Sequence, residues 1–170
     1  RFLLTGAEQS AAVGRIRLGN GFATGFLVAP GVLMTNWHVF RNSHEARNAR
    51  IEFGFRELTT DGTTSQPTTF RLDMDRLFFN DKDLDVAIVA VGNRVQGQIE
   101  LESLPFCRLQ GRSDAILARE RLNIIQHPAG EPKQVALRDN LIFSIPDETF
   151  IQYHSDTKRG SSGSPTFNDE

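Results

Sequence analysis

The sequence has a single cysteine, Cys107, among its 170 residues. One cysteine cannot form an internal disulfide, which is compatible with the reducing cytoplasm and slightly favours it. Bacterial secreted enzymes without disulfides also exist, so the compartment stays open. Nothing around Cys107 in "LPFCRL" supports a thiol nucleophile, and we expect this residue to pack as a small hydrophobe.

The sequence has no long apolar run and no large excess of either positive or negative charge. The longest apolar runs, at Phe26 to Ala29 and Val86 to Val91, are far too short to span a bilayer. The net charge is −2, with acidic and basic residues interspersed. The sequence therefore predicts neither a nucleic acid nor a membrane as a partner. No pair of its four histidines has metal-ligand spacing, so we expect no metal and no other cofactor.

The remaining composition is that of a soluble globular protein. Hydrophobic residues make up 39% of the chain and charged residues 24%. A chain of 170 residues is long enough to bury a core, as one ordinary domain or two very small ones.

Short apolar or alternating segments, separated by turn residues, repeat along the whole chain. Such a pattern predicts an all-β fold, either a barrel or a sandwich. The expected strands are Val13–Leu18, Phe22–Val28, Val32–Thr35, Ile51–Phe55, Thr68–Leu72, Asp85–Val91, Leu122–Gln126, Gln134–Leu137, Asn140–Ile145 and Thr149–His154.

Three polar segments interrupt the expected strands. The segment "RNSHEARNAR", residues 41–50, predicts one or two helical turns, and "TTDGTTSQPTT", residues 59–69, predicts a surface loop. The segment "GNRVQGQIELES" favours a boundary between two halves, residues 1–95 and residues 96–170.

Serine and glycine are concentrated in "RGSSGSP" near the end of the sequence. A serine hydroxyl needs a base to become a nucleophile, and the oxyanion formed by its attack needs hydrogen-bond donors. Gly160 can adopt backbone angles that other residues avoid, so its N–H and that of Ser162 could converge as an oxyanion hole. The alternative interpretation of the segment is a flexible terminal loop.

His38, in "LMTNWHVF", is the histidine best placed to serve as the base, because it follows a strand that we expect to be buried. A purely structural histidine is the alternative at this position. We expect His44 to be solvated, His127 to lie in a turn, and His154 to be a wall residue near the serines.

A third group must orient the imidazole and stabilise its cation. In "DKDLDVAIVAV", the candidates are Asp81, Asp83 and Asp85, and Asp85 directly precedes the apolar strand. Capping or solvation is the alternative role for each of them. The chain order of His38, Asp85 and Ser162 differs from the order Ser, Asp, His of the α/β-hydrolases.

These motifs together resemble the trypsin-like serine peptidases of the chymotrypsin fold. The matching segments are "GFLVAPGVLMTNWHVF", "DVAIVAV" and "GSSGSP", supported by "IIQHPAGEPKQVALR" and "YHSDT". Among this family, the sequence is most similar to the bacterial branch that includes the glutamyl endopeptidases. The resemblance implies two six-stranded antiparallel β-barrels and a polypeptide substrate. It places His38 and Asp85 in the first barrel and Ser162 in the second.

The sequence departs from this family after its serine motif. The family continues for several strands, whereas eight residues follow Ser162 here. We therefore expect the second barrel to be incomplete at its C-terminal side, with further domains or a second chain supplying the missing strands. The expected function is that of a serine endopeptidase, weakly active in this form. The alternative is an inactive trypsin-fold module that binds peptides or regulates a larger protein.

The resemblance also implies two candidate residues for the pocket that selects the side chain before the cleaved bond. Asp156 falls where trypsin-like members place the base of the specificity pocket, and it would favour Arg or Lys before the cleaved bond. Thr157 falls where the glutamyl branch uses a threonine, and it would favour an acidic side chain. Both residues could equally lie in an exposed loop.

Overall fold

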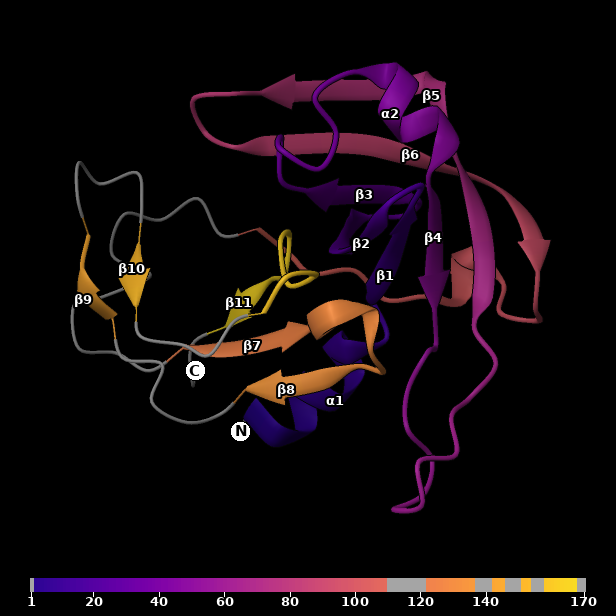
Figure 1. The fold of residues 1–170 in the computed structure, drawn as a ribbon, viewed down its shortest axis with the longest axis vertical. Coiled ribbons are helices and arrows are strands. Elements are labelled where there is room, and N and C mark those ends of the chain that lie inside the picture. The colour runs from indigo at the N-terminus through magenta and orange to yellow at the C-terminus, as the bar shows by residue number, and fades with distance from the viewer. Residues whose placement is uncertain (1, 110–121, 137–141, 146–150, 154–157, 168–170) are drawn as a thin grey trace.

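The computed structural model describes residues 2–109, 122–136, 142–145, 151–153 and 158–167. Strands dominate these residues, and helical segments are few and short (Figure 1). The predicted all-β class is confirmed.

The first half of the chain forms a closed antiparallel barrel. Its strands are β1 (Val13–Leu18), β2 (Gly21–Ala29), β3 (Val32–Thr35), β4 (Arg50–Phe53), β5 (Thr68–Asp81) and β6 (Val86–Gln96). Their order around the barrel is β1-β2-β3-β6-β5-β4, and each strand pairs with both of its neighbours. Closure leaves no long unpaired strand edge in this half.

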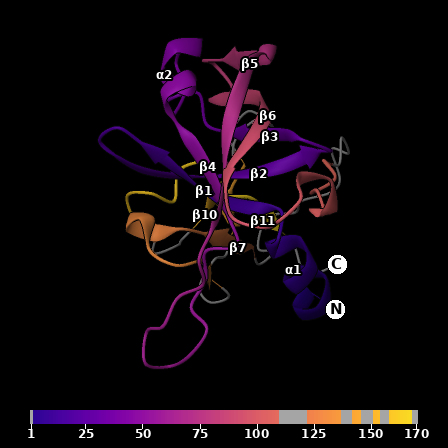
Figure 2. The ribbon, with the colours of Figure 1, turned by 90° about the vertical axis from the view of Figure 1, so that its right-hand side faces the viewer.

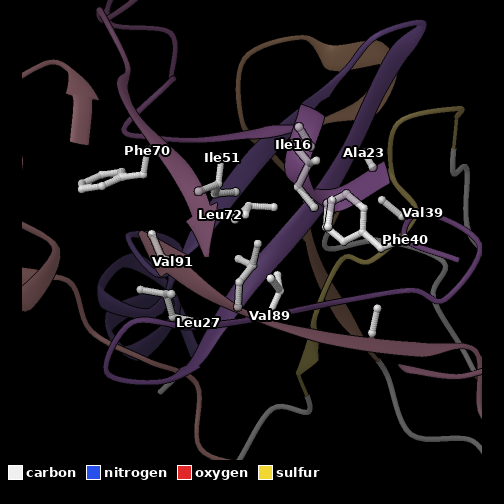
Figure 3. Close-up of a cluster of buried hydrophobic side chains, with 14 of the residues drawn as sticks. Ile16, Ala23, Leu27, Val39, Phe40, Ile51, Phe70, Leu72, Val89 and Val91 are labelled. Atoms are coloured by element: carbon white, nitrogen blue, oxygen red, sulfur yellow. The ribbon is translucent and has the colours of Figure 1, made fainter. Parts of the chain in front are cut away.

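Apolar side chains from all six strands fill the barrel (Figure 3). Successive residues of a strand point to opposite faces, so each strand can contribute several side chains to this core. Ile16, Leu33 and Val89 are fully buried. Each such side chain contributes roughly 1.5–3 kcal/mol to stability when removed from water.

The second half contributes two small sheets to the described structure. β7 (Asn123–Gln126) lies between β8 (Gln134–Ala136) and β11 (Thr166–Phe167), and β9 (Ile142–Ser144) pairs with β10 (Gln152–Tyr153). Two 3₁₀-helices, η1 (Leu101–Ser103) and η2 (Pro128–Gly130), lie in the connections. The division into residues 1–95 and 96–170 stays a prediction.

Two α-helices lie outside the sheets. The predicted helical turns are confirmed as α2 (Ser43–Asn48), whose first turn is capped by the side chain of Asn42. The sequence pattern did not predict α1 (Phe2–Ser10), whose last carbonyl, of Ser10, accepts a hydrogen bond from the distant Lys133 ammonium. Within the described ranges, neither helix has the length and apolar character needed to cross a membrane.

Several strand predictions differ from the structure in extent, and β6, for example, continues five residues past the predicted end at Val91. β5 continues to Asp81, beyond the predicted end at Leu72, although the charged residues Asp73, Asp75 and Arg76 interrupt the apolar pattern there. It continues because it pairs with β6 through several register shifts. The loop predicted at residues 59–69 lies between β4 and β5, except that β5 begins at Thr68 (Figure 2). Asp85 precedes β6 rather than opening it, and β11 was not anticipated.

Candidate active site

His38 and Asp85 meet at the ends of neighbouring barrel strands. His38 follows β3 and Asp85 precedes β6, and these two strands pair with each other. The Nδ1 atom of His38 lies 2.9 Å from Oδ2 of Asp85 and 3.0 Å from Oδ1. The main-chain N–H of His38 also donates to Oδ1, at 3.0 Å. Because a carboxylate only accepts, we assign the proton of a neutral imidazole to Nδ1, which leaves Nε2 as an acceptor.

The backbone at Asp85 is held in an unusual conformation. Its φ of 51° lies in the left-handed region, which costs a non-glycine residue roughly 1–2 kcal/mol. The side chain of Asn36 donates to the Asp85 carbonyl at 3.0 Å and supports this conformation. Asp81 has a different role, since its carboxylate accepts the main-chain N–H groups of Asp83 and Leu84 in the preceding turn.

Ser162 lies in a segment of successive turns, residues 158–165, which we call the serine loop. Gly160 and Gly163 have φ values of 97° and 85°, which favour glycine. A Cβ atom on Gly163 would also lie 2.1 Å from the carbonyl oxygen of Thr24 and 2.2 Å from Oγ1 of Thr35. The glycines of "GSSGSP" therefore allow the loop to pack directly against the barrel.

Thr24, a fully buried residue of β2, holds the serine loop in place. Its main-chain N–H donates to the carbonyl of Ser162 at 2.8 Å, and its hydroxyl donates to the carbonyl of Gly160 at 2.8 Å. The same hydroxyl accepts the main-chain N–H of His127 at 3.1 Å. One threonine thus connects a strand of the first barrel to two separate segments of the second half.

Thr24 is also connected to the strand that leads to His38. The hydroxyl of Thr35, the last residue of β3, donates to the Thr24 carbonyl at 2.8 Å. His38 follows three residues later. The positions of Ser162 and His38 are therefore both set by main-chain contacts of Thr24.

The peptide between Arg159 and Gly160 has a defined orientation. Its carbonyl accepts the main-chain N–H of Ala129, in η2, at 2.5 Å. In a trans peptide the C=O and N–H groups point in opposite directions, so the Gly160 N–H points away from η2. In the described part of the chain, no main-chain hydrogen bond is donated by the amide of Gly160 or of Ser162.

A cavity of about 350 Å³ opens beside these amides. Residues of β1, β2 and the turn between them form one wall, and η2 and the serine loop form the other. The lining residues are Leu18, Asn20, Gly21, Phe22, Ala129, Arg159, Gly160 and Ser162.

The structure thus brings together His38 and Asp85 and attaches Gly160 and Ser162 to the same barrel. Among the described residues, no hydrogen bond joins the His38 imidazole to the Ser162 hydroxyl. Asp156 and Thr157, the two expected specificity residues, lie outside the described residues, as does His154.

Two other residues considered from the sequence take no part in this arrangement. The Cys107 side chain is buried in the barrel core, and burial raises the pKa of its thiol to about 11, so the thiol stays protonated at neutral pH. His44 is exposed in α2, beside Asn48. Within the described ranges, no cluster of three or more histidine, cysteine or acidic side chains could hold a metal ion.

His127 lies at the turn predicted for it but is fully buried there. Its Nδ1 contacts the Glu131 carbonyl at 3.0 Å, and its ring stacks on Phe55 with centroids 6.3 Å apart. Desolvation lowers the pKa of His127 to about 4, so the ring is neutral at physiological pH. Its role is structural, since it supports η2 beneath the serine loop.

The family model of the trypsin-like peptidase domain matches residues 23–170. Among curated proteins, the uncharacterized protein y4fB of Sinorhizobium fredii is 34% identical over 183 residues, covering 99% of this chain and 27% of that protein. The chain therefore spans about a quarter of this relative's length.

Solved structures share the fold. The Rv3671c protease, in its inactive form, has a TM-score of 0.59 and 23% identity, covering 94% of this chain and 73% of that chain. Deg5 has a TM-score of 0.64 and 17% identity, covering 98% of this chain and 78% of that chain. At these identities the comparison shows the fold alone.

Replacing Thr24 by valine removes the buried hydroxyl while keeping the shape of the side chain. The Gly160 carbonyl and the His127 amide then lose a partner, so we expect the free energy of unfolding to fall by about 1–3 kcal/mol. Urea denaturation measures this change. Thr24→Ser keeps the hydroxyl and is the matched control. Equal stability of the valine and serine variants would contradict the proposed role.

Burial of neutral His127 makes stability depend on pH. Because its folded-state pKa of about 4 lies below the ordinary 6.5, the unfolded chain binds more protons between these values. The free energy of unfolding therefore decreases by about 3 kcal/mol as the pH falls from 6.5 to 4. Urea denaturation at several pH values gives the free energy of unfolding as a function of pH. The slope of this function should be shallower for His127→Phe than for wild type, and unchanged for His44→Gln. Identical slopes for wild type and His127→Phe would refute this account.

Proposed function

Because this chain belongs to the family of trypsin-like peptidase domains, we propose that it is a serine endopeptidase with His38, Asp85 and Ser162 as its catalytic triad. Membership of a peptidase family implies a polypeptide substrate. The observation that carries the proposal is the contact between Nδ1 of His38 and both oxygens of Asp85. This contact fixes the tautomer in which Nε2 can accept a proton.

In the proposed reaction, Oγ of Ser162 attacks the carbonyl carbon of the substrate while Nε2 of His38 takes the hydroxyl proton. Asp85 stabilises the resulting imidazolium. The C–N bond then breaks, the leaving amine takes the proton from His38, and the acyl group stays on Ser162 as an ester. A water molecule, deprotonated by His38, attacks this ester, and the carboxylic acid is released with Ser162 regenerated.

The amides of Gly160 and Ser162 are the proposed oxyanion hole. Two features support this role: the Arg159 carbonyl is held by η2, and the Gly160 N–H points away from η2. A Cβ atom on Gly160 would lie 2.8 Å from the His127 carbonyl oxygen, so only glycine fits this position without a shift. The adjoining cavity offers space for substrate groups beside these donors.

Residue preference remains a prediction of the sequence. Asp156 would favour a basic side chain before the cleaved bond, and Thr157 would favour an acidic one, as in the glutamyl endopeptidases. Profiling with a peptide library separates these two outcomes.

The alternative function is that of an inactive module which binds peptides or regulates a larger protein. It is favoured by the lack of a hydrogen bond between His38 and Ser162 among the described residues. Catalytic hydrogen bonds are often long in unliganded enzymes, so this observation does not outweigh the contact of His38 with Asp85.

A fluorophosphonate probe decides between the two functions. We expect one covalent adduct, located on Ser162 by peptide mapping, because the activated hydroxyl attacks phosphorus as it would a carbonyl carbon. Ser162→Ala should abolish labelling, and His38→Ala should slow it by roughly 10²- to 10⁴-fold.

Ser161→Ala is the matched control, because the Ser161 hydroxyl is buried and has no hydrogen-bond partner among the described residues. It should be labelled at the wild-type rate. Absence of labelling in a folded wild-type chain would favour the inactive module, and equal labelling of Ser162→Ala would exclude the assigned nucleophile.

A further inference from the structure

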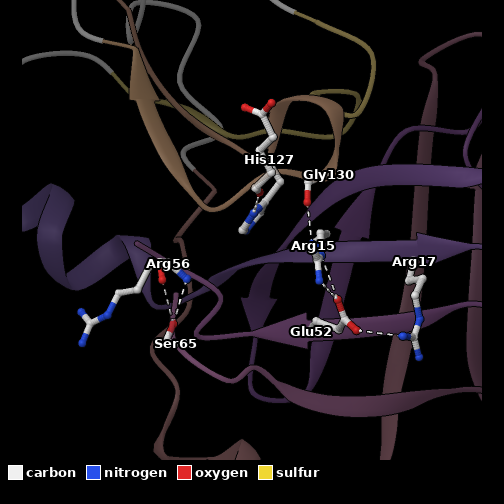
Figure 4. Close-up of polar contacts among 8 residues, drawn as sticks. Arg15, Arg17, Glu52, Arg56, Ser65, His127 and Gly130 are labelled. Carbon is white, nitrogen blue, oxygen red and sulfur yellow. Dashed lines mark hydrogen bonds and ion pairs between the residues drawn. The ribbon is translucent and has the colours of Figure 1, made fainter. Parts of the chain in front are cut away.

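Arg15 of β1 extends from the barrel to η2 of the second half (Figure 4). Its Nε and Nη2 atoms lie 2.8 and 2.7 Å from Oε2 of Glu52, and its Nη1 donates to the carbonyl of Gly130 at 2.5 Å. A guanidinium has five donors in a rigid fork, so one side chain can bind both acceptors at once.

The surroundings hold this guanidinium in one position. The Arg15 side chain is 14% exposed and that of Glu52 is 3% exposed. The carbon atom of the guanidinium lies 3.8 Å from the ring centre of Phe55 and 5.0 Å from that of Phe22. Since the ion pair with the buried Glu52 carboxylate and the two aromatic rings hold the guanidinium from several sides, the donor aimed at Gly130 is fixed by the barrel.

The backbone that receives this hydrogen bond is strained. Ala129 has a φ of 53° and Gly130 a φ of 73°. A left-handed alanine is unfavourable and persists only where its surroundings determine the conformation. The carbonyl that accepts the hydrogen bond from Arg15 belongs to Gly130, the residue directly after Ala129.

Ala129 in turn acts on the serine loop. Its N–H donates to the Arg159 carbonyl at 2.5 Å, in the peptide that carries the Gly160 N–H. A rotation of Ala129 would release this carbonyl and allow the peptide to turn. The contacts therefore run without a break from Arg15 through Gly130 and Ala129 to the Gly160 amide.

We infer that Arg15 is a positioning residue that holds η2 in its left-handed conformation and thereby keeps the Gly160 N–H directed toward the oxyanion. This inference rests on the proposed function of the Gly160 amide. Arg15 itself contacts neither the substrate nor the reacting atoms. Its effect passes through the main chain of η2.

The first test is Arg15→Lys. A single ammonium retains the charge beside Glu52 but cannot reproduce the fork that also reaches Gly130. We expect the maximal rate of fluorophosphonate labelling at Ser162 to fall roughly 10- to 100-fold with the probe's reversible affinity unchanged.

The matched control for this test is Arg17→Lys. Arg17 lies on the same strand, with Nη1 3.5 Å from Oε1 of Glu52, but its side chain is 54% exposed. This variant should be labelled at the wild-type rate. Equal rates for the two lysine variants would overturn the inference.

Amide hydrogen exchange tests the same inference without any labelling. In Arg15→Lys, the Ala129 amide should exchange faster, whereas the barrel amides of β3 and β6 should keep their protection. Unchanged exchange at Ala129 would overturn the positioning role even if wild type is labelled. Failure of wild type to be labelled would instead count against the proposed catalytic function, and exchange at Ala129 would still decide the role of Arg15.

A second variant covers the case in which Arg15→Lys unfolds. Replacing Arg15 by Met together with Glu52 by Leu removes the buried ion pair and keeps the volume, a change that is often tolerated. Faster exchange of the Ala129 amide is expected in this double variant as well. Retained protection there would contradict the inference.

Discussion

The hydroxyl of Thr24 is the contact on which the arrangement of the site depends. It is buried between the barrel and the second half, where it donates to the Gly160 carbonyl and accepts the His127 N–H. Buried polar groups are costly when they have no hydrogen-bond partner. A single position of the serine loop gives partners to the Thr24 hydroxyl, the Gly160 carbonyl and the His127 N–H together. The strand that carries Thr24 also binds β3, which leads to His38. Contacts of Thr24 therefore place Ser162 and the strand that leads to His38, while the side-chain contact with Asp85 orients the His38 imidazole.

A second set of polar contacts, partly buried, joins the two halves of the chain. Arg15 reaches the Gly130 carbonyl, and the main-chain N–H of Lys133 donates to the Phe55 carbonyl at 3.1 Å. These contacts have defined directions, unlike the apolar packing of the barrel core. They orient η2, and η2 orients the peptide that precedes Gly160. The barrel thus supplies both His38 and the support for the proposed oxyanion hole.

Much of this architecture could be predicted from local sequence patterns. The barrel strands coincide with short apolar segments bounded by turn residues, and the motifs around His38, Asp85 and Ser162 occur in the order of the trypsin-like family. Local patterns did not predict α1, the full length of β5, or β11, because pairing and docking with distant segments determine them. The roles of Thr24 and Arg15 were missed for the same reason, since their partners Gly160 and Gly130 lie 136 and 115 residues away.

The most direct test is a crystal structure of the chain with a phosphonate bound covalently to Ser162. The account predicts that the phosphonyl oxygen lies about 2.7–3.1 Å from the amide nitrogens of Gly160 and Ser162. Nε2 of His38 should lie within about 2.6–3.2 Å of the oxygen that joins Ser162 to phosphorus. A phosphonyl oxygen directed into solvent, with the Gly160 N–H turned toward η2, would contradict the account.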